Sequence, residues 1–261
     1  MHQSVKSLFA VIAACLFIIY NHPAFADPSP WLVQQTLKGT LEIYQQGQLI
    51  GQLIPALFEP NWRYSSASSN WQFSSELIKR SNTEQFARFK TASGALVDLT
   101  SSATVREPNK LEAQFTMTSP RQLTLLSLHT EFVIASELWK EAQFTTSNTT
   151  GTLPRQLGSE IHLFSGKTQR FTFRHPRLGT LTFQFPQPTQ VLLQDNRKWG
   201  KTFSLRIGRV DNSPFQWQAN SPFTVQLSLQ TSVPLKFSRQ SSKKMKEDSQ
   251  WVKLPVNTLQ I

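Results

Sequence analysis

Carboxylates are the side chains of this chain that could perform general acid and base catalysis. The 261 residues include 16 acidic ones, and Glu131, Glu137, Glu141 and Glu160 fall within one stretch. Glycoside hydrolysis requires two carboxylates about 5–10 Å apart across the scissile bond. The spacing in the sequence does not show that any two of these converge, and exposed carboxylates that balance basic residues are the commoner arrangement. No catalytic residue is therefore assigned.

Histidines and short motifs give no further chemistry. His129, His162 and His175 lie in three different inferred segments, without the spacing of metal ligands. His129 follows an apolar run, so we expect a strand position and the role of a hydrogen-bonded structural histidine. The sequence lacks a Gly-x-Ser-x-Gly elbow, a His-Glu-x-x-His motif and a Gly-rich phosphate loop. We expect neither a metal nor another cofactor.

Aromatic residues give the stronger indication of a binding site. Trp62, Tyr64 and Trp71 flank a serine-rich loop, and Trp199 lies in a turn that also contains Arg197. An exposed ring can stack on the apolar face of a sugar while neighbouring polar side chains bond its hydroxyls. These five residues are the candidate ligand-binding residues. The competing interpretation is that the tryptophans belong to the core, where large rings are most often found.

Two interpretations are open for the turn at 194–200. In the structural one, Asp195 and Asn196 form a tight corner, Arg197 pairs with Asp195, and Trp199 covers the end of the sheet. In the other, Arg197 and Trp199 line a ligand site. The structural interpretation is favoured.

Alternation of apolar and polar residues predicts the elements that must position these side chains. Two runs are nearly perfect, at 111–118 and 223–230, and similar patterns recur along the chain between Gly- and Pro-containing turns. Many short strands with frequent turns predict an all-β fold, a large antiparallel β-sandwich. One short helix is expected at 136–142, where a capping residue precedes good helix formers.

The N-terminus predicts export. Residues 1–26 read as a signal peptide, with an apolar core that ends before Ala24-Phe25-Ala26, and we expect cleavage before Asp27. Residues 27–261 then form a single domain, periplasmic or extracellular, without a membrane-spanning helix and without a cysteine. The alternative is a lipoprotein anchored at Cys15, which we disfavour because the apolar core continues beyond that residue.

An excess of basic residues favours an anionic partner. The chain has 27 basic and 16 acidic residues, a net charge of +11, and part of the excess lies in a basic segment near 236–246. In an exported protein this favours an anionic polysaccharide, lipopolysaccharide phosphate or membrane headgroups over nucleic acid. The alternative is a solvated basic segment without a dedicated ligand.

The segment at 190–208, together with Phe223–Leu229, resembles the β-sandwich domains found beside the catalytic domains of bacterial glycoside hydrolases. Those accessory domains are similar to the galactose-mutarotase-like supersandwich, so the resemblance implies two large antiparallel sheets. The resemblance covers about the C-terminal third of the chain, and this sequence includes no adjoining α/β catalytic barrel. A mutarotase would also need a histidine paired with a carboxylate, and the sequence does not identify such a pair.

The leading functional hypothesis is therefore noncatalytic binding of a cell-surface or extracellular polysaccharide. It rests on predicted export, an all-β scaffold, clustered aromatic residues and the resemblance. The first alternative is a carbohydrate-active enzyme, either a hydrolase or a mutarotase-like protein. The second is an envelope interaction protein that binds lipopolysaccharide or another protein.

Overall fold

Alternating apolar residues form the strands that the sequence predicts. In β7 (Lys110–Thr118), Leu111, Ala113 and Phe115 are buried, while Glu112 and Gln114 between them are more exposed. The neighbouring strand β16 (Phe223–Thr231) runs antiparallel to it and places Val225 opposite Phe115. This register puts both apolar sets on the same face of the sheet, because side chains alternate between faces along a strand.

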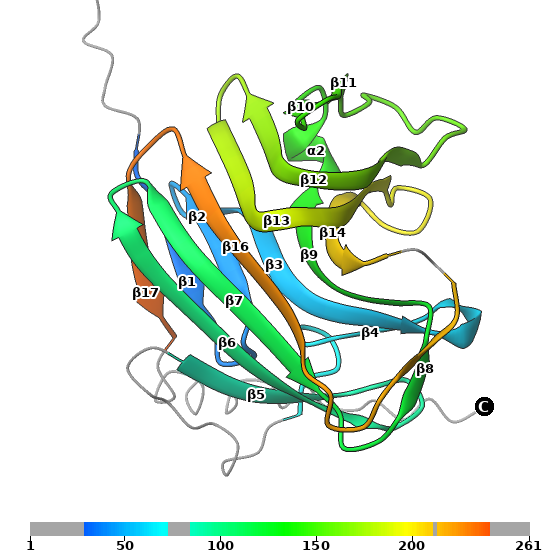
Figure 1. Ribbon diagram of the computed structural model, residues 1–261. Helices are drawn as coiled ribbons and strands as arrows, with labels where there is room; N and C mark the ends of the chain where they lie inside the picture. Colours follow the sequence, from blue (N-terminus) through cyan, green and yellow to red (C-terminus); the bar gives the residue numbers. More distant parts are fainter. Residues whose placement is uncertain (1–28, 73–83, 211–212, 241–261) are drawn as a thin grey trace, which may run out of the picture.

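The computed structural model describes residues 29–72, 84–210 and 213–240 (Figure 1). The predicted signal peptide at 1–26 and part of the basic segment, residues 241–246, lie outside the described residues. Within those residues no helix is long and apolar enough to cross a membrane. The elements are, in chain order, β1 (Trp31–Gln35), β2 (Leu41–Gln45), β3 (Gln48–Glu59), the 3-10 turn η1 (Pro60–Trp62), β4 (Arg63–Ser66), β5 (Glu84–Lys90), β6 (Leu96–Glu107), β7 (Lys110–Thr118), β8 (Leu123–Leu125), β9 (Ser127–Ala135), α2 (Ser136–Trp139), β10 (Gln143–Thr145), β11 (Thr150–Thr152), β12 (His162–His175), β13 (Gly179–Asp195), β14 (Thr202–Arg209), β15 (Phe215–Trp217), β16 (Phe223–Thr231) and β17 (Leu235–Arg239).

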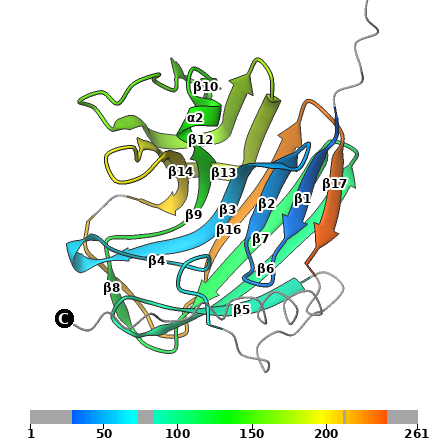
Figure 2. The same ribbon diagram turned by 180° about the vertical axis from the view of Figure 1, so that it is seen from behind.

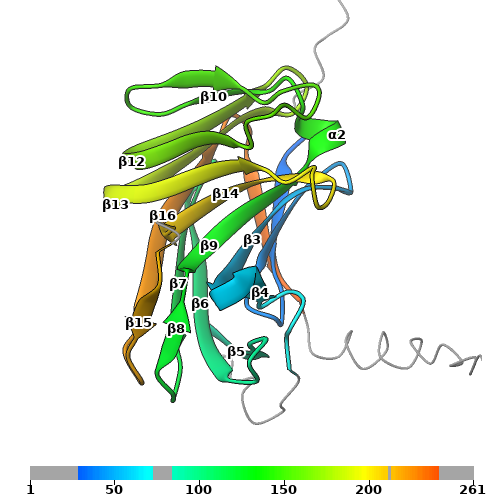
Figure 3. The same ribbon diagram turned by 90° about the vertical axis from the view of Figure 1, so that its right-hand side faces the viewer.

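Fifteen of these strands form one curled sheet, which confirms the predicted all-β class. Its main path runs β17-β1-β2-β3-β9-β14-β13-β16-β7-β6-β5, and β1 and β17 form a parallel pair within it. Seen from behind, β1 and β17 lie beside β6, near the other end of that path (Figure 2). In the side view, β12, β13, β14 and β9 follow one another from top to bottom (Figure 3).

The long strand β13 divides the sheet into two layers. Leu181–Gln184 pair with β16, whereas Val191–Asp195 pair with β14, and β12 runs along the other side of both halves. Pro186 and Pro188 lie between the halves, and proline lacks the N–H that a ladder needs. The first layer (β16, β7, β6, β5) thus separates from the second (β14, β9, β3, β2, β1, β17). The predicted sandwich is a single sheet folded on itself.

The hydrophobic core lies between the two layers. Phe132 of β9 and Phe183 of β13 meet with ring centroids 5.0 Å apart, and Phe173 of β12 lies 5.9 Å from Phe132. All three rings are fully buried. Their mutual packing joins the second layer to the region where the layers separate, because aromatic rings bury large apolar areas.

The predicted helix is present but shorter than expected. Trp139, its last residue, is fully buried and donates its indole N–H to the carbonyl of Ile50 at 2.7 Å. Lys140 leaves the helical conformation with ψ 141°, and the N–H of Glu141 bonds the carbonyl of Leu153 at 2.8 Å. Backbone pairing with the segment at Leu153 therefore replaces the second helical turn.

Candidate ligand-binding site

The strand β9 crosses the second layer and is buried on both of its faces. Leu128, Phe132 and Ile134 point into the core, as alternation requires. His129 and Glu131 alternate with them and point to the outer face, yet both are buried. Titratable side chains are thus withdrawn from water on the face that ordinarily carries solvated residues.

Neighbouring strands bring an aromatic hydroxyl and a cation to Glu131. The chain after β3 turns back through η1 into β4, where the hydroxyl of Tyr64 donates a short hydrogen bond to Oε1 of Glu131. Arg206 of β14 lies opposite Glu131 in the strand register, with its Nε 3.9 Å from Oε2. The guanidinium also lies over the ring of Phe58 in β3, 4.7 Å from the ring centre. Four strands therefore contribute to one buried polar cluster.

His129 lies beside this cluster, next to Phe58 and Glu131. It is fully buried, its ring stacks on Phe58 at 6.1 Å, and its Nε2 lies 3.9 Å from Oε2 of Glu131. That distance exceeds a hydrogen bond, and neither ring nitrogen has a hydrogen-bond partner among the described residues. The predicted strand position is confirmed, but the predicted hydrogen-bonded role is wrong. The imidazole packs against an aromatic ring instead.

Burial and neighbouring charge set the protonation of the cluster. Burial lowers the pKa of His129, so this imidazole is neutral at pH 7. Burial is the largest influence on Glu131 and raises its pKa, but the polar and charged groups around it, including the Arg206 guanidinium and the Tyr64 hydroxyl, leave the pKa below its usual value. Burial, with the adjacent Glu131, raises the pKa of Tyr64 and keeps its hydroxyl a donor. Burial lowers the pKa of Arg206, although a guanidinium keeps its proton in proteins.

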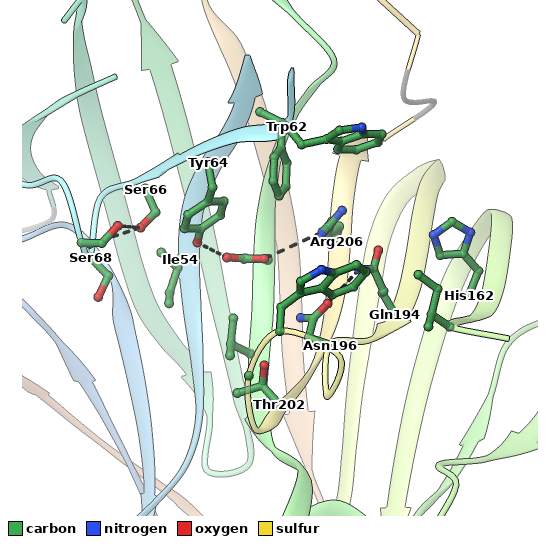
Figure 4. Close-up of a pocket in the computed structure, with 17 residues that line it drawn as sticks. Ile54, Trp62, Tyr64, Ser66, Ser68, His162, Gln194, Asn196, Thr202 and Arg206 are labelled. Carbon is green, nitrogen blue, oxygen red and sulfur yellow. Dashed lines mark hydrogen bonds and ion pairs between the residues drawn. The ribbon is translucent and has the colours of Figure 1, made fainter. Parts of the chain in front are cut away.

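A cavity of about 860 Å³ opens over this cluster (Figure 4). The volume falls within the range of about 300–1,000 Å³ that is typical of small-molecule sites. Glu131 lies between Tyr64 and Arg206: its Oε1 accepts the Tyr64 hydroxyl, and its Oε2 is 3.9 Å from Nε of Arg206. The other lining residues are Ile54, Phe58, Trp62, Ser66, Ser68, Ser69, Val133, Ile161, His162, Gln194, Asn196, Trp199, Gly200 and Thr202.

Three of the five predicted site residues meet at this cavity. Trp62 and Tyr64 reach it from η1 and β4, and Trp199 reaches it from the turn between β13 and β14. Trp62 and Trp199 remain 55% and 64% exposed. The cavity therefore has two aromatic rings accessible to a ligand, contributed by segments far apart in the sequence.

The other two predicted residues lie elsewhere. Trp71 is partly buried against the core, and its backbone forms an isolated antiparallel bridge with Phe89. Arg197 forms a forked pair with the fully buried Asp195, with a shortest N–O distance of 2.6 Å, and its guanidinium lies over Phe203. Neither Trp71 nor Arg197 lines the cavity. The geometry at Arg197 is that of the structural interpretation.

The sequence did not identify the charged pair at the centre of the site. Glu131 is followed by the apolar residues Phe132, Val133 and Ile134, and Arg206 lies between Leu205 and Ile207. A charge beside apolar strand residues is the signal that could have marked them. Their meeting depends on the pairing of β9 with β14, two strands that are separated in the sequence by residues 136–201. Gln194 and Asn196 were not predicted as site residues, because the turn that contains them was interpreted as structural.

The four acidic residues that the sequence grouped do not meet at one site. Of these, Glu131 alone lines the cavity, whereas Glu137 and Glu141 line a separate, smaller hollow beside His175. Glu160 is exposed, just before the lining segment of β12. The described residues place no second carboxylate at the cavity, and they include no group of three side chains suited to a metal.

Comparison with known proteins shows a weak likeness in fold. The chain matches no protein-family model and no curated protein. An α-galactosidase from Lactobacillus brevis superposes with a TM-score of 0.41 at 10% identity, over 69% of this chain and 26% of that one. A galactose mutarotase related enzyme from Lactobacillus acidophilus gives a TM-score of 0.33 at 6% identity, over 76% of this chain and 91% of that one.

Proposed function

We propose that the cavity binds a saccharide and that the protein acts as a noncatalytic carbohydrate-binding protein. The observation that carries this proposal is the meeting of Trp62 and Trp199 at one cavity. Six large hydrophobic side chains are exposed among the described residues, and three of them, Trp62, Tyr64 and Trp199, line this single cavity. Exposed rings that gather at a cavity supply the apolar surface on which a sugar ring stacks.

The backbone at Trp62 supports a ligand-contacting role. Asn61 and Trp62 have φ values of 63° and 58°, in the left-handed region. For a bulky residue such as tryptophan this conformation is unusual and costs of order 1–3 kcal/mol. Strain of this kind persists where the surrounding structure over-determines it, and it concentrates at ligand-binding segments. Here it holds the indole at the cavity.

Side-chain amides in the cavity are held in fixed orientations. Gln194 donates to Oδ1 of Asn196 at 2.9 Å, and the amide nitrogen of Asn196 donates to the hydroxyl of Ser204 at 2.9 Å. On the other side, the hydroxyls of Ser66 and Ser69 bond each other at 2.8 Å. Oriented amides and hydroxyls beside apolar walls are the groups that sugar hydroxyls require.

The test is a glycan array followed by titration calorimetry with the mature protein. Each of Trp62→Ala and Trp199→Ala should weaken the affinity roughly 2- to 10-fold, because an aromatic contact contributes about 0.5–1.5 kcal/mol. Trp62→Phe should retain most of the binding. Leu157→Ala is the matched control, since Leu157 is also exposed but lies outside the cavity. Absence of binding to any glycan, or equal losses in the control, would refute the proposal.

The proposal includes export, which rests on the sequence at 1–26. A saccharide of the cell surface or the surroundings is then encountered in the periplasm or outside the cell. Mass spectrometry of the native protein tests this part. A chain that starts at Asp27 is the expected result, whereas a lipid on Cys15 would replace a free protein by an anchored one.

A further inference from the structure

Arg206 is a buried cation that lacks an acceptor. Its side chain is 7% exposed, and its Nε has no hydrogen-bond partner in the described part of the chain. The nearest carboxylate oxygen, Oε2 of Glu131, is 3.9 Å away, beyond hydrogen-bond distance. A buried guanidinium ordinarily bonds several acceptors, because burial without them is costly. The structure therefore leaves the Nε donor of Arg206 unsatisfied.

The surroundings hold this guanidinium in place at the cavity. Phe58 covers one face of the group, with its ring centre 4.7 Å from the guanidinium carbon, and Glu131 lies beside it. Arg206 itself lines the cavity (Figure 4). An acceptor supplied from the cavity could reach the remaining N–H groups without moving the side chain.

Glu131 does not take the role of that acceptor. Its Oε1 accepts the hydroxyl of Tyr64, and its Oε2 lies 3.9 Å from both His129 Nε2 and Arg206 Nε. It offsets part of the positive charge across this distance but makes no hydrogen bond to the guanidinium. A single sugar hydroxyl could accept one N–H. An oxyanion matches the planar fork with two bonds and adds the attraction between opposite charges.

The cavity mouth adds to the attraction for anions. Lys198 lies over the ring of Trp199, 5.7 Å from the ring centre. It is exposed and forms no salt bridge with a residue that the structure describes. An unpaired cation beside a cleft raises the local concentration of anionic ligands.

We infer that the saccharide is acidic and that its carboxylate or phosphate group pairs with Arg206. This inference rests on the proposed function and narrows it to one class of sugar. The acidic group would lie at the centre of the cavity, where Glu131 accepts the hydroxyl of Tyr64 and makes no hydrogen bond to Arg206. Sugar rings on either side of it would then reach Trp62 and Trp199.

The test compares acidic oligosaccharides with neutral partners of the same ring structure. Oligomers of galacturonate, mannuronate and guluronate are each paired with their methyl esters, and sugar phosphates are paired with the parent sugars. Titration calorimetry of the mature protein at 150 mM salt should show about tenfold or greater preference for the acid, since a hydrogen bond to a charged group contributes about 1.5–3 kcal/mol. Inorganic phosphate alone is included, and should bind far more weakly.

Substitutions of Arg206 test separately the two-bond geometry of its guanidinium and its positive charge. Arg206→Gln should remove most of the preference for the acid over the ester, and Arg206→Lys should restore only part of that preference. Arg174→Gln is the matched control, because Arg174 is exposed on β12 and lies outside the cavity. Thermal melting of each variant shows whether it is folded.

The outcomes distinguish the inference of an acidic saccharide from the proposed function of saccharide binding. Equal affinity for acid and ester on the unsubstituted protein overturns the acidic class while saccharide binding stands, and it does so even if Arg206→Gln does not fold. Inorganic phosphate that binds as tightly as the acidic sugar also overturns the inference. If no saccharide binds in either set, the proposed function itself fails.

Discussion

The turn between β13 and β14 allows stability and binding to be perturbed separately within three residues. Arg197 pairs with Asp195, which is fully buried, and also donates to the carbonyl of Arg155 at 2.9 Å. Trp199, two residues further on, is 64% exposed and lines the cavity. We therefore expect Arg197→Ala to destabilise the fold and Trp199→Ala to leave the stability nearly unchanged.

The size of each effect follows from burial. Arg197→Ala leaves the carboxylate of Asp195 buried without its cation, and breaking a buried pair costs about 3–5 kcal/mol. Because the Arg197 side chain is 13% exposed, the lower end, about 3 kcal/mol, applies. In a domain of 150–250 residues, 1 kcal/mol shifts Tm by about 2–4 °C, so Tm should fall by about 6–12 °C. For the exposed Trp199 the change should stay within about 0.5 kcal/mol, or about 2 °C.

Thermal unfolding of the mature protein, followed by circular dichroism at pH 7, measures both effects. Arg197→Lys is the control for charge: it keeps the cation but loses the fork, and should melt between the unsubstituted protein and Arg197→Ala. A Tm for Arg197→Ala within about 2 °C of the unsubstituted protein would refute the importance of the pair. A fall for Trp199→Ala as large as that for Arg197→Ala would show that the indole supports the fold.

Two further predictions concern the second layer. Gly51→Ala should lower the free energy of unfolding by about 1–3 kcal/mol, because a Cβ at Gly51 would overlap the ring of Phe132, and denaturant unfolding measures this; an unchanged midpoint would contradict the packing of that ring. Burial holds the folded-state pKa of His129 below 6.5, so below about pH 6.5 the unfolded state binds a proton that the folded state does not, and stability falls as pH decreases. His129→Gln should reduce the loss of Tm between pH 7.5 and pH 5.5, whereas an unchanged loss would assign it to other groups, such as His175, whose pKa burial also lowers.

The strands could be predicted because their signal is local. Where one face of a strand is buried, apolar residues recur at every second position, and Leu111, Phe115 and Val225 follow this rule. The division of β13 between two partner strands was harder to predict from the sequence. Pro186 and Pro188 are visible in the sequence, but the two different partners of β13 are β14 and β16, two separate segments that both follow it in the chain. Alternation does not specify such partners.

The candidate site was predicted in part for the same reason. Trp62, Tyr64 and Trp199 were identified because aromatic residues in loops and turns stand out in a sequence, and the structure places them at one cavity. Glu131 and Arg206 depend on the register of β9 with β14, which no local pattern reveals. Arg197 and Trp71 share the residue types expected of a site, but pairing with buried groups or packing against the core explains them.

The buried pair of Glu131 and Arg206 is poorly explained by stability. Removing two charges from water costs several kcal/mol per ion, and apolar residues of similar volume would often serve the fold as well or better. At 3.9 Å the pair also lacks the close geometry that would offset this cost. Its position fits another purpose, because it lies at a cavity lined by two exposed tryptophans. A ligand that supplies the missing acceptor to Arg206 would recover in binding what the fold loses in desolvation, so the arrangement favours recognition of an anionic group over a structural role.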